Sequence, residues 1–165
     1  EDGKAAASIL SSSLPSSKRG DIRFAFDGDA VLFSDEAEEE YQKNGLEDFL
    51  STEKNLANVP LRGGPFRSFV ESLNQLKSEF IGDTNPIRTA LVTARSSPAH
   101  ERVVKTLRSW GMSVDESLFL GGLEKAAFLK SYGADIFFDD QAEHCRIASE
   151  TVLAGHVPSG VKNRT

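Results

Sequence analysis

The chain contains short apolar segments that end at carboxylate or hydroxyl side chains, and this pattern restricts the fold more than any other feature. Segments of this length that stop at a turn are typical of buried strands. Three of them stand out: residues 22–26 before Asp27-Gly28-Asp29, residues 88–92 before Thr93, and residues 136–138 before Asp139-Asp140. A fourth strand is expected over 117–120, and a last one near His156.

Segments with helical spacing lie between these strands. We expect helices over residues 98–110, 123–132 and 142–152. Strands that alternate with helices through short polar turns predict a mostly parallel, Rossmann-like sheet with helices on both faces. The expected fold class is therefore α/β, arranged as a three-layer sandwich.

Two other stretches have a different character. Residues 11–20 are rich in Ser, Pro and Gly, as in a linker, and a short strand is expected just before them. Between residues 34 and 83, an acidic start is followed by apolar residues at helical spacing around 46–50 and again over 66–80. The aromatic residues of the second helix are expected mainly in the core.

The composition limits the kinds of molecule that the protein is expected to bind. The 165 residues carry a formal net charge of −6 with no dense block of Lys or Arg, so a nucleic acid polymer is not an expected partner. No apolar run approaches the roughly 18 residues that would indicate a membrane-spanning helix. Cys145 is the single cysteine, which excludes an internal disulfide and favours a buried thiol in a reducing compartment. The sequence leaves a homo-oligomer open.

The polar residues that follow the strands predict a reactive site. In an open parallel sheet, ligands bind outside the carboxyl ends of the strands. The residues expected to meet there are Asp27, Asp29, Thr93, Lys125, Asp139 and Asp140. Crowded carboxylates repel one another unless a cation lies among them, and their hard oxygen atoms suit Mg²⁺.

This set of side chains matches the needs of phosphoryl transfer. Asp27 could attack phosphorus and form an aspartyl-phosphate. Asp29 could protonate the leaving oxygen and later activate water. Thr93 and Lys125 could hold the phosphoryl oxygens.

Each group also has a simpler explanation. Asp27-Gly28-Asp29 alone fits an Asx turn, and Asp139-Asp140 alone fits a helix cap. Lys125 alone reads as a surface lysine. Their order along the chain, directly after apolar segments, favours the site.

Four motifs resemble those of the haloacid dehalogenase superfamily. They are FAFDGDAV (residues 24–31), LVTAR at Thr93, EKAAFL at Lys125 and FFDD at Asp139 and Asp140. The resemblance implies a haloacid dehalogenase-like core with a small helical cap inserted between the first two motifs. The expected division is a core of residues 21–33 and 84–165, a cap of residues 34–83, and a tail or linker of residues 1–20.

Longer stretches are similar to the cytosolic 5′-nucleotidase I family. They are FDGDAVLFSDEAE, PIRTALVTARSSPAHERVVKTLRSWG, ESLFLGG, IFFDDQAEH and HVPSGV. This resemblance implies a cytoplasmic, Mg²⁺-dependent phosphoric monoester hydrolase that acts on nucleoside 5′-monophosphates, AMP foremost. Family proteins carry a further segment before the first motif, so the chain is expected to be the catalytic part of a longer protein.

The resemblance also assigns roles to residues. It implies Asp27 as the nucleophile and Asp29 as the acid/base. The metal would be shared by Asp27, the Asp29 backbone carbonyl and the Asp139/Asp140 pair, with Asp140 the first choice for direct ligation. Thr93, Ala94 and Lys125 would bind the phosphate.

A few residues have weaker signals. Phe49 and Phe66 are candidates for stacking on a nucleobase. Arg95 could reach a phosphate, although a surface position at a helix start explains it equally well. His144 has metal-ligand spacing after Asp140 but is expected on a helix surface, and His156 is expected to have a structural role.

Two other functions stay open. The same chemistry could serve a sugar phosphate or another small phosphomonoester. A domain that folds without turnover would also fit a chain that is part of a longer protein.

Overall fold

The computed structural model of the protein describes residues 5–10, 19–80 and 85–164. Its six strands form one sheet in the order β1-β6-β5-β2-β3-β4, in which β1 is antiparallel to β6 and the other pairs are parallel. The strands are β1 (Ser8–Ile9), β2 (Ile22–Phe26), β3 (Ile87–Thr93), β4 (Glu116–Phe119), β5 (Ile136–Asp139) and β6 (Leu153–His156). The expected α/β fold with a mostly parallel sheet is confirmed.

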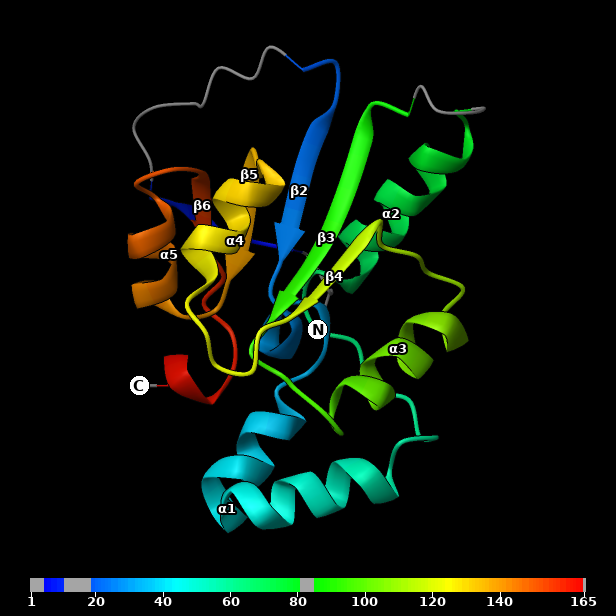
Figure 1. Ribbon diagram of the computed structural model, residues 1–165, viewed down its shortest axis with the longest axis vertical. Helices are drawn as coiled ribbons and strands as arrows, with labels where there is room; N and C mark the ends of the chain where they lie inside the picture. Colours follow the sequence, from blue (N-terminus) through cyan, green and yellow to red (C-terminus); the bar gives the residue numbers. More distant parts are fainter. Residues whose placement is uncertain (1–4, 11–18, 81–84, 165) are drawn as a thin grey trace.

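Helices cover both faces of the sheet (Figure 1). The helical elements are η1 (Gly28–Leu32), α1 (Glu36–Asn55), α2 (Arg67–Ser78), α3 (His100–Ser109), α4 (Lys125–Tyr132), α5 (Ala142–Ala148) and η2 (Val161–Asn163). α2 and α3 share one core cluster with Phe26 and Leu91, while α4 and α5 share another with Ala25 and Ala90. Because successive strand residues point to opposite faces, each central strand contributes to both clusters.

The segment between β2 and β3 contributes two helices with different positions. α1 lies beyond the carboxyl ends of the strands, whereas α2 lies beside the sheet (Figure 1). Phe69 of α2 packs its ring 6.0 Å from that of Phe24 and 6.1 Å from that of Phe26. α1 bends at Gly45, whose φ of +82° is a conformation that glycine adopts without strain.

The expected division of the chain into core, cap and tail stays a prediction. Most of the expected linker (residues 11–20), and the boundary expected between residues 83 and 84, lie outside the described residues. Among the residues that are described, no helix combines the length and the apolar character needed to cross a membrane.

The expected helices and strands are present, with one clear difference in length. The helix expected over 142–152 is wrong at its C-terminal end, because α5 stops at Ala148. β6 begins at Leu153, which pairs with Ile136 of β5. The backbone must leave the helix before that strand can form.

The expectation that Phe66 stacks on a nucleobase is also wrong. Its side chain is only 3% exposed and belongs to the core. The ring centroid lies 4.6 Å from that of Phe138 and 6.3 Å from that of Phe26. Helical spacing of aromatic residues therefore marks a core face here, as expected for this helix as a whole.

We expect Phe66→Ala to lower the free energy of unfolding by about 3–5 kcal/mol, because it removes a buried ring and leaves a cavity. Phe80→Ala is the matched control, since Phe80 is 44% exposed and its loss should cost no more than about 1 kcal/mol. Urea denaturation of both variants measures the difference. Equal losses would show that Phe66 does not belong to the core.

Candidate active site

The carboxylates of the site follow two neighbouring strands. β2 lies between β3 and β5, and the strand order reverses between β2 and β5. The backbone N–H of Asp27 donates to the carbonyl oxygen of Phe138 over 2.8 Å, so the ends of β2 and β5 are held side by side. The carboxyl edge of a sheet at such a switch point is where ligands of open α/β folds bind.

Lys125 connects the two strand ends. Its ammonium nitrogen lies 2.9 Å from Oδ1 of Asp27 and 2.6 Å from Oδ2 of Asp139. Lys125 is the first residue of α4 and is only 5% exposed. Oxygen atoms of Asp27, Asp139 and Asp140 all lie within 4.8 Å of one another. The residues expected at the strand ends therefore meet in one buried cluster.

The three carboxyl groups of the cluster have different pKa values. Burial, with Asp139 and Asp29 nearby, raises the pKa of Asp27 to about 6 even though Lys125 opposes the shift. Burial, followed by repulsion from Asp27 and Asp139, raises the pKa of Asp140 to about 8. Burial also disfavours the charge of Asp139, but Lys125 and His144 hold its pKa below the ordinary value.

The neighbouring carboxylates also explain why Lys125 keeps its positive charge. Burial alone would lower its pKa, but Asp27 and Asp139 raise the pKa above the ordinary value. Lys125 therefore stays charged and pairs with two of the three carboxylates, although its single charge can balance only one of them.

The hydrogen bonds indicate which oxygen atoms are available to a metal ion. Oδ1 of Asp139 accepts from the backbone N–H of Gln141 at 2.7 Å, and Oδ2 accepts from Lys125 and lies 3.1 Å from Nδ1 of His144. The Asp140 carboxylate has no hydrogen-bond partner within the described part of the chain. Buried oxygen donors of this kind fit Mg²⁺, and the free carboxylate of Asp140 fits direct ligation better than Asp139.

Asp27 also has one oxygen free. Its Oδ1 accepts from the backbone N–H of Gly28 at 2.7 Å as well as from Lys125. None of the described residues donates to Oδ2. An oxygen held at the site without a donor is free to approach an electrophile or a metal ion.

Thr93 and Ala94 reach the cluster from the end of β3. A Cβ added at Gly28 would lie 3.1 Å from Oγ1 of Thr93, so the β2 turn passes the β3 end closely. A small polar pocket of about 100 Å³ lies at this point. It is lined by Asp27, Asp29, Glu38, Thr93, Ala94, Asp140, Gln141 and Lys162.

Asp29 is held by Arg95. Nε and Nη2 of Arg95 donate to the two Asp29 oxygens over 2.9 and 2.8 Å. Arg95 is 5% exposed, so the surface position considered from sequence is wrong. Its guanidinium group faces carboxylates, which makes it a holder of Asp29 rather than a free phosphate ligand.

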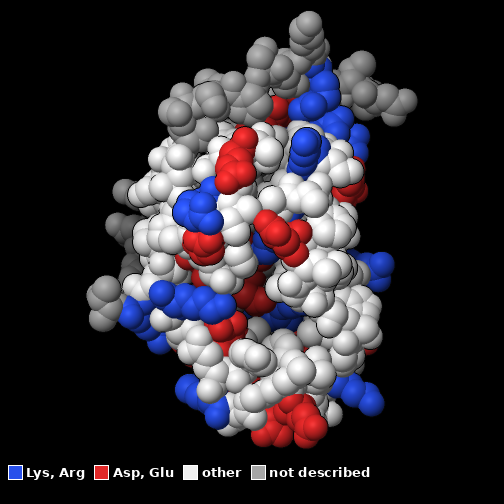
Figure 2. Space-filling view, turned by 60° about the vertical axis from the view of Figure 1, so that its left-hand side comes forward, with Lys and Arg blue, Asp and Glu red and all other residues white. Residues whose placement is uncertain are grey.

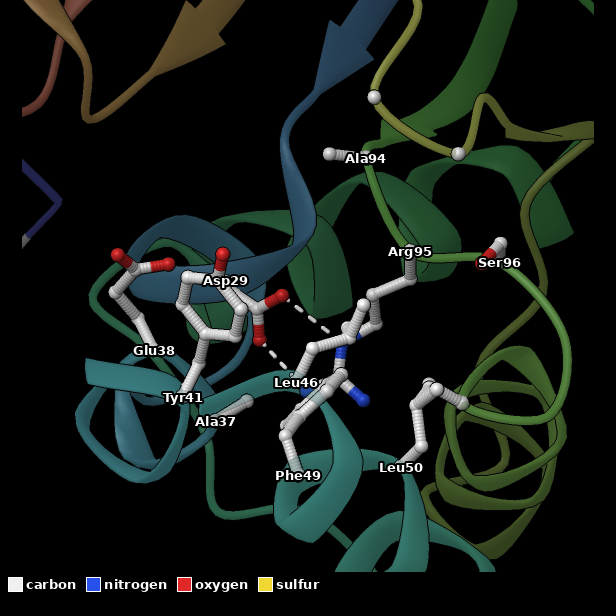
Figure 3. A pocket seen from close by; sticks show the side chains of 13 residues that line it. Asp29, Ala37, Glu38, Tyr41, Leu46, Phe49, Leu50, Ala94, Arg95 and Ser96 are labelled. Carbon is white, nitrogen blue, oxygen red and sulfur yellow. Dashed lines mark hydrogen bonds and ion pairs between the residues drawn. The ribbon is translucent and has the colours of Figure 1, made fainter. Parts of the chain in front are cut away.

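A larger pocket of about 410 Å³ adjoins the polar one, and Asp29, Glu38 and Ala94 line both. Figure 3 shows Tyr41, Leu46, Phe49 and Leu50 of α1 around it, opposite Ala94 and Arg95. Phe49 lines this pocket, so its stacking on a nucleobase stays a prediction, whereas Phe66 does not line it. One face of the molecule is hollowed, with acidic and basic side chains in and around the hollow (Figure 2).

Four further residues lie at or behind the site, and the sequence pointed to only two of them, His144 and His156. His144 lies against Asp139, not on an uninvolved helix surface, and its spacing after Asp140 was the signal. Nε2 of His156 lies 2.9 Å from the Asp140 carbonyl oxygen, which agrees with the structural role expected for it. Glu53 and Arg102 form ion pairs behind Arg95, and nothing in their sequence surroundings marked them.

The fold and the site together define a mixed α/β protein with a buried acidic site at a topological switch point. The chain belongs to the 5′-nucleotidase family, whose profile matches residues 1–164. It is 45% identical over 128 residues to human cytosolic 5′-nucleotidase 1B. The match covers 74% of this chain but 21% of the human protein, so the chain spans about a fifth of that relative. No solved structure matches the chain.

We expect Mg²⁺ to stabilise the protein against unfolding and Asp140→Asn to remove most of that effect. At about 100 times its dissociation constant, a ligand that binds only the folded state adds about 2.7 kcal/mol. Without divalent cations, Asp140→Asn should be more stable than wild type at neutral pH. The raised pKa of Asp140 means that its carboxyl group ionises more readily in the unfolded chain than in the folded one, and Asn removes that cost.

Thermal unfolding with EDTA and with Mg²⁺ measures both effects. Asp48→Asn is the control, since Asp48 is exposed on α1 and its removal should leave the Mg²⁺ shift intact. An undiminished Mg²⁺ shift in Asp140→Asn would contradict the assignment.

Proposed function

We propose that the protein is a Mg²⁺-dependent 5′-nucleotidase that hydrolyses nucleoside 5′-monophosphates, with AMP the favoured substrate. The observation that carries the proposal is Asp27, whose Oδ2 accepts no hydrogen bond from the described residues and which lines a small polar pocket. A larger, mostly apolar pocket adjoins it and shares Asp29, Glu38 and Ala94 with it. A phosphoryl group fits the chemistry of the first pocket and a nucleoside that of the second.

The metal ion would be held by Asp140 and Asp27, with the Asp29 backbone carbonyl and, less directly, Asp139. Bound Mg²⁺ would neutralise phosphoryl oxygens and lower the repulsion between the substrate and the carboxylates. Family membership supports this assignment, as does the oxygen-only donor set.

In the first step, Oδ2 of Asp27 attacks phosphorus while the bond from phosphorus to the 5′ oxygen breaks. Asp29 gives its proton to that oxygen, so the nucleoside leaves as a neutral alcohol. The Lys125 ammonium group and the Thr93 hydroxyl, together with the backbone N–H groups near Ala94, donate to the phosphoryl oxygens.

In the second step, water attacks the aspartyl-phosphate. The Asp29 carboxylate takes a proton from that water, the bond from phosphorus to Asp27 breaks, and phosphate leaves. Asp27 returns to its carboxylate form and Asp29 to its acid form. The two steps sum to hydrolysis of one phosphate ester by one water molecule.

The preference for a nucleotide rests on the larger pocket. Tyr41 and Phe49 supply aromatic rings, which stack on nucleobases with little dependence on their identity. The human relative is a cytosolic 5′-nucleotidase by name, and this supports the same substrate class and a cytoplasmic location for the protein. The proposal includes a haloacid dehalogenase-like core with α1 as the cap over the site.

We expect the purified chain to release phosphate from AMP with Mg²⁺, and Asp27→Asn to lose at least about a thousandfold in kcat/KM, since the nucleophile is gone. Asp48→Asn is the control and should match wild type. Phosphate release from AMP, other nucleoside 5′-monophosphates and glucose 6-phosphate tests substrate class.

Equal kcat/KM for the sugar phosphate would favour a general phosphomonoesterase. Wild-type rates in Asp27→Asn would rule out this nucleophile. Absence of release from every ester would favour a domain that folds without turnover.

A further inference from the structure

Behind Asp29 lies a chain of buried ion pairs that ends in α1. Arg95 donates through Nη1 to Oε2 of Glu53 over 2.5 Å, while its other two donors hold Asp29. Glu53 is 1% exposed and lies in α1. The Arg95 guanidinium group is therefore held by two carboxylates, those of Asp29 and of Glu53 in α1.

Glu53 is itself fixed from the other side. Its Oε1 accepts from Nη1 of Arg102 over 2.7 Å, and Arg102 also donates to the Val59 carbonyl oxygen and to Glu36. Arg102 lies in α3, on the flank of the sheet. Glu53 is thus clamped between two guanidinium groups.

The geometry of Arg95 makes Glu53 important for Asp29. A guanidinium group is planar, so a carboxylate on one edge sets the direction of the donors on the others. Burial would lower the pKa of Arg95, but Asp29 and Glu53 raise it above the ordinary value, which keeps the group charged. Each carboxylate oxygen has two lone pairs, so the hydrogen bonds from Arg95 leave a lone-pair direction on each Asp29 oxygen open toward substrate.

We infer that Glu53 is a positioning residue: through Arg95 it fixes the Asp29 carboxyl group in line with the leaving oxygen. The inference rests on the proposed function, because it concerns the proton that Asp29 gives to the ester oxygen as the bond to phosphorus breaks. Glu53 itself lies behind Arg95 and takes no part in bond making.

A leaving-group series isolates this role. A basic leaving group needs the proton that Asp29 donates, whereas p-nitrophenolate can leave without it. The value of kcat/KM for these esters reports only the steps up to and including departure of the leaving group. We expect a shallow dependence of log kcat/KM on leaving-group pKa in wild type across substituted phenyl phosphates. In Glu53→Gln the dependence should be steeper, with a loss of about 10- to 100-fold for phenyl phosphate and less than about threefold for p-nitrophenyl phosphate.

The comparison separates positioning from loss of fold. A smaller folded fraction lowers kcat/KM for all esters by the same factor. It therefore leaves the slope of log kcat/KM against leaving-group pKa unchanged. The esters differ little in size, so a changed nucleoside pocket cannot imitate the effect. Glu47→Gln, an exposed acid of the same helix, should keep the wild-type slope.

If Glu53→Gln does not fold, Arg95→Lys carries the same test, because one ammonium group cannot hold two carboxylates as a planar fork does. An unchanged slope in the folded variant, with an active wild type, would overturn the role of Glu53 and leave the proposed function intact. A wild type that hydrolyses no phosphate ester would instead overturn the proposed function, and with it this inference.

Discussion

The ion pairs of Lys125 with Asp27 and Asp139 are the interaction on which the site depends. Three carboxylates lie together at the ends of β2 and β5 with exposures of 0–5%. Burying such charges is costly unless cations compensate them. Lys125 pairs with two of them and is placed by the first turn of α4. Because one ammonium charge cannot balance three carboxylates, further positive charge is needed for all three to ionise, and the divalent cation of the proposed mechanism would supply it.

A second set of ion pairs gives α1 a defined relation to the sheet. Arg95 follows β3, Arg102 lies in α3, and both reach Glu53 of α1. At the other end of the helix, Arg164 pairs with Glu39 over 2.6 Å and Lys162 with Glu38 over 3.3 Å. The helix that lines the larger pocket is therefore held by charges at both ends. This arrangement joins the proposed nucleoside pocket to the residues proposed for phosphoryl transfer.

The sequence predicted the strands and helices that have a regular apolar pattern. It did not predict features that depend on contacts between residues distant in the chain. Strands such as 22–26 and 136–138 stand out because buried parallel strands are mostly apolar, and Arg23 is the one charged residue within these two segments. The meeting of Asp27, Lys125 and Asp139 was expected because each was predicted at or near the carboxyl end of a parallel strand. Phe66 and Phe49 could not be told apart from sequence, since both have apolar neighbours at helical spacing, but Phe66 precedes α2 and is buried, whereas Phe49 lies in α1 beside a pocket. Glu53 resembles any other acid of a polar helix, and its burial arises from two arginines distant in sequence.

The central claim is that Asp27 forms a covalent phosphoryl intermediate. The most direct measurement is rapid acid quenching of the protein during turnover of AMP labelled in its phosphate, followed by peptide mapping of the label. The account predicts transient label on the peptide that contains Asp27, lost again as phosphate is released. Steady release of phosphate with no labelled peptide, or label on a different residue, would contradict it.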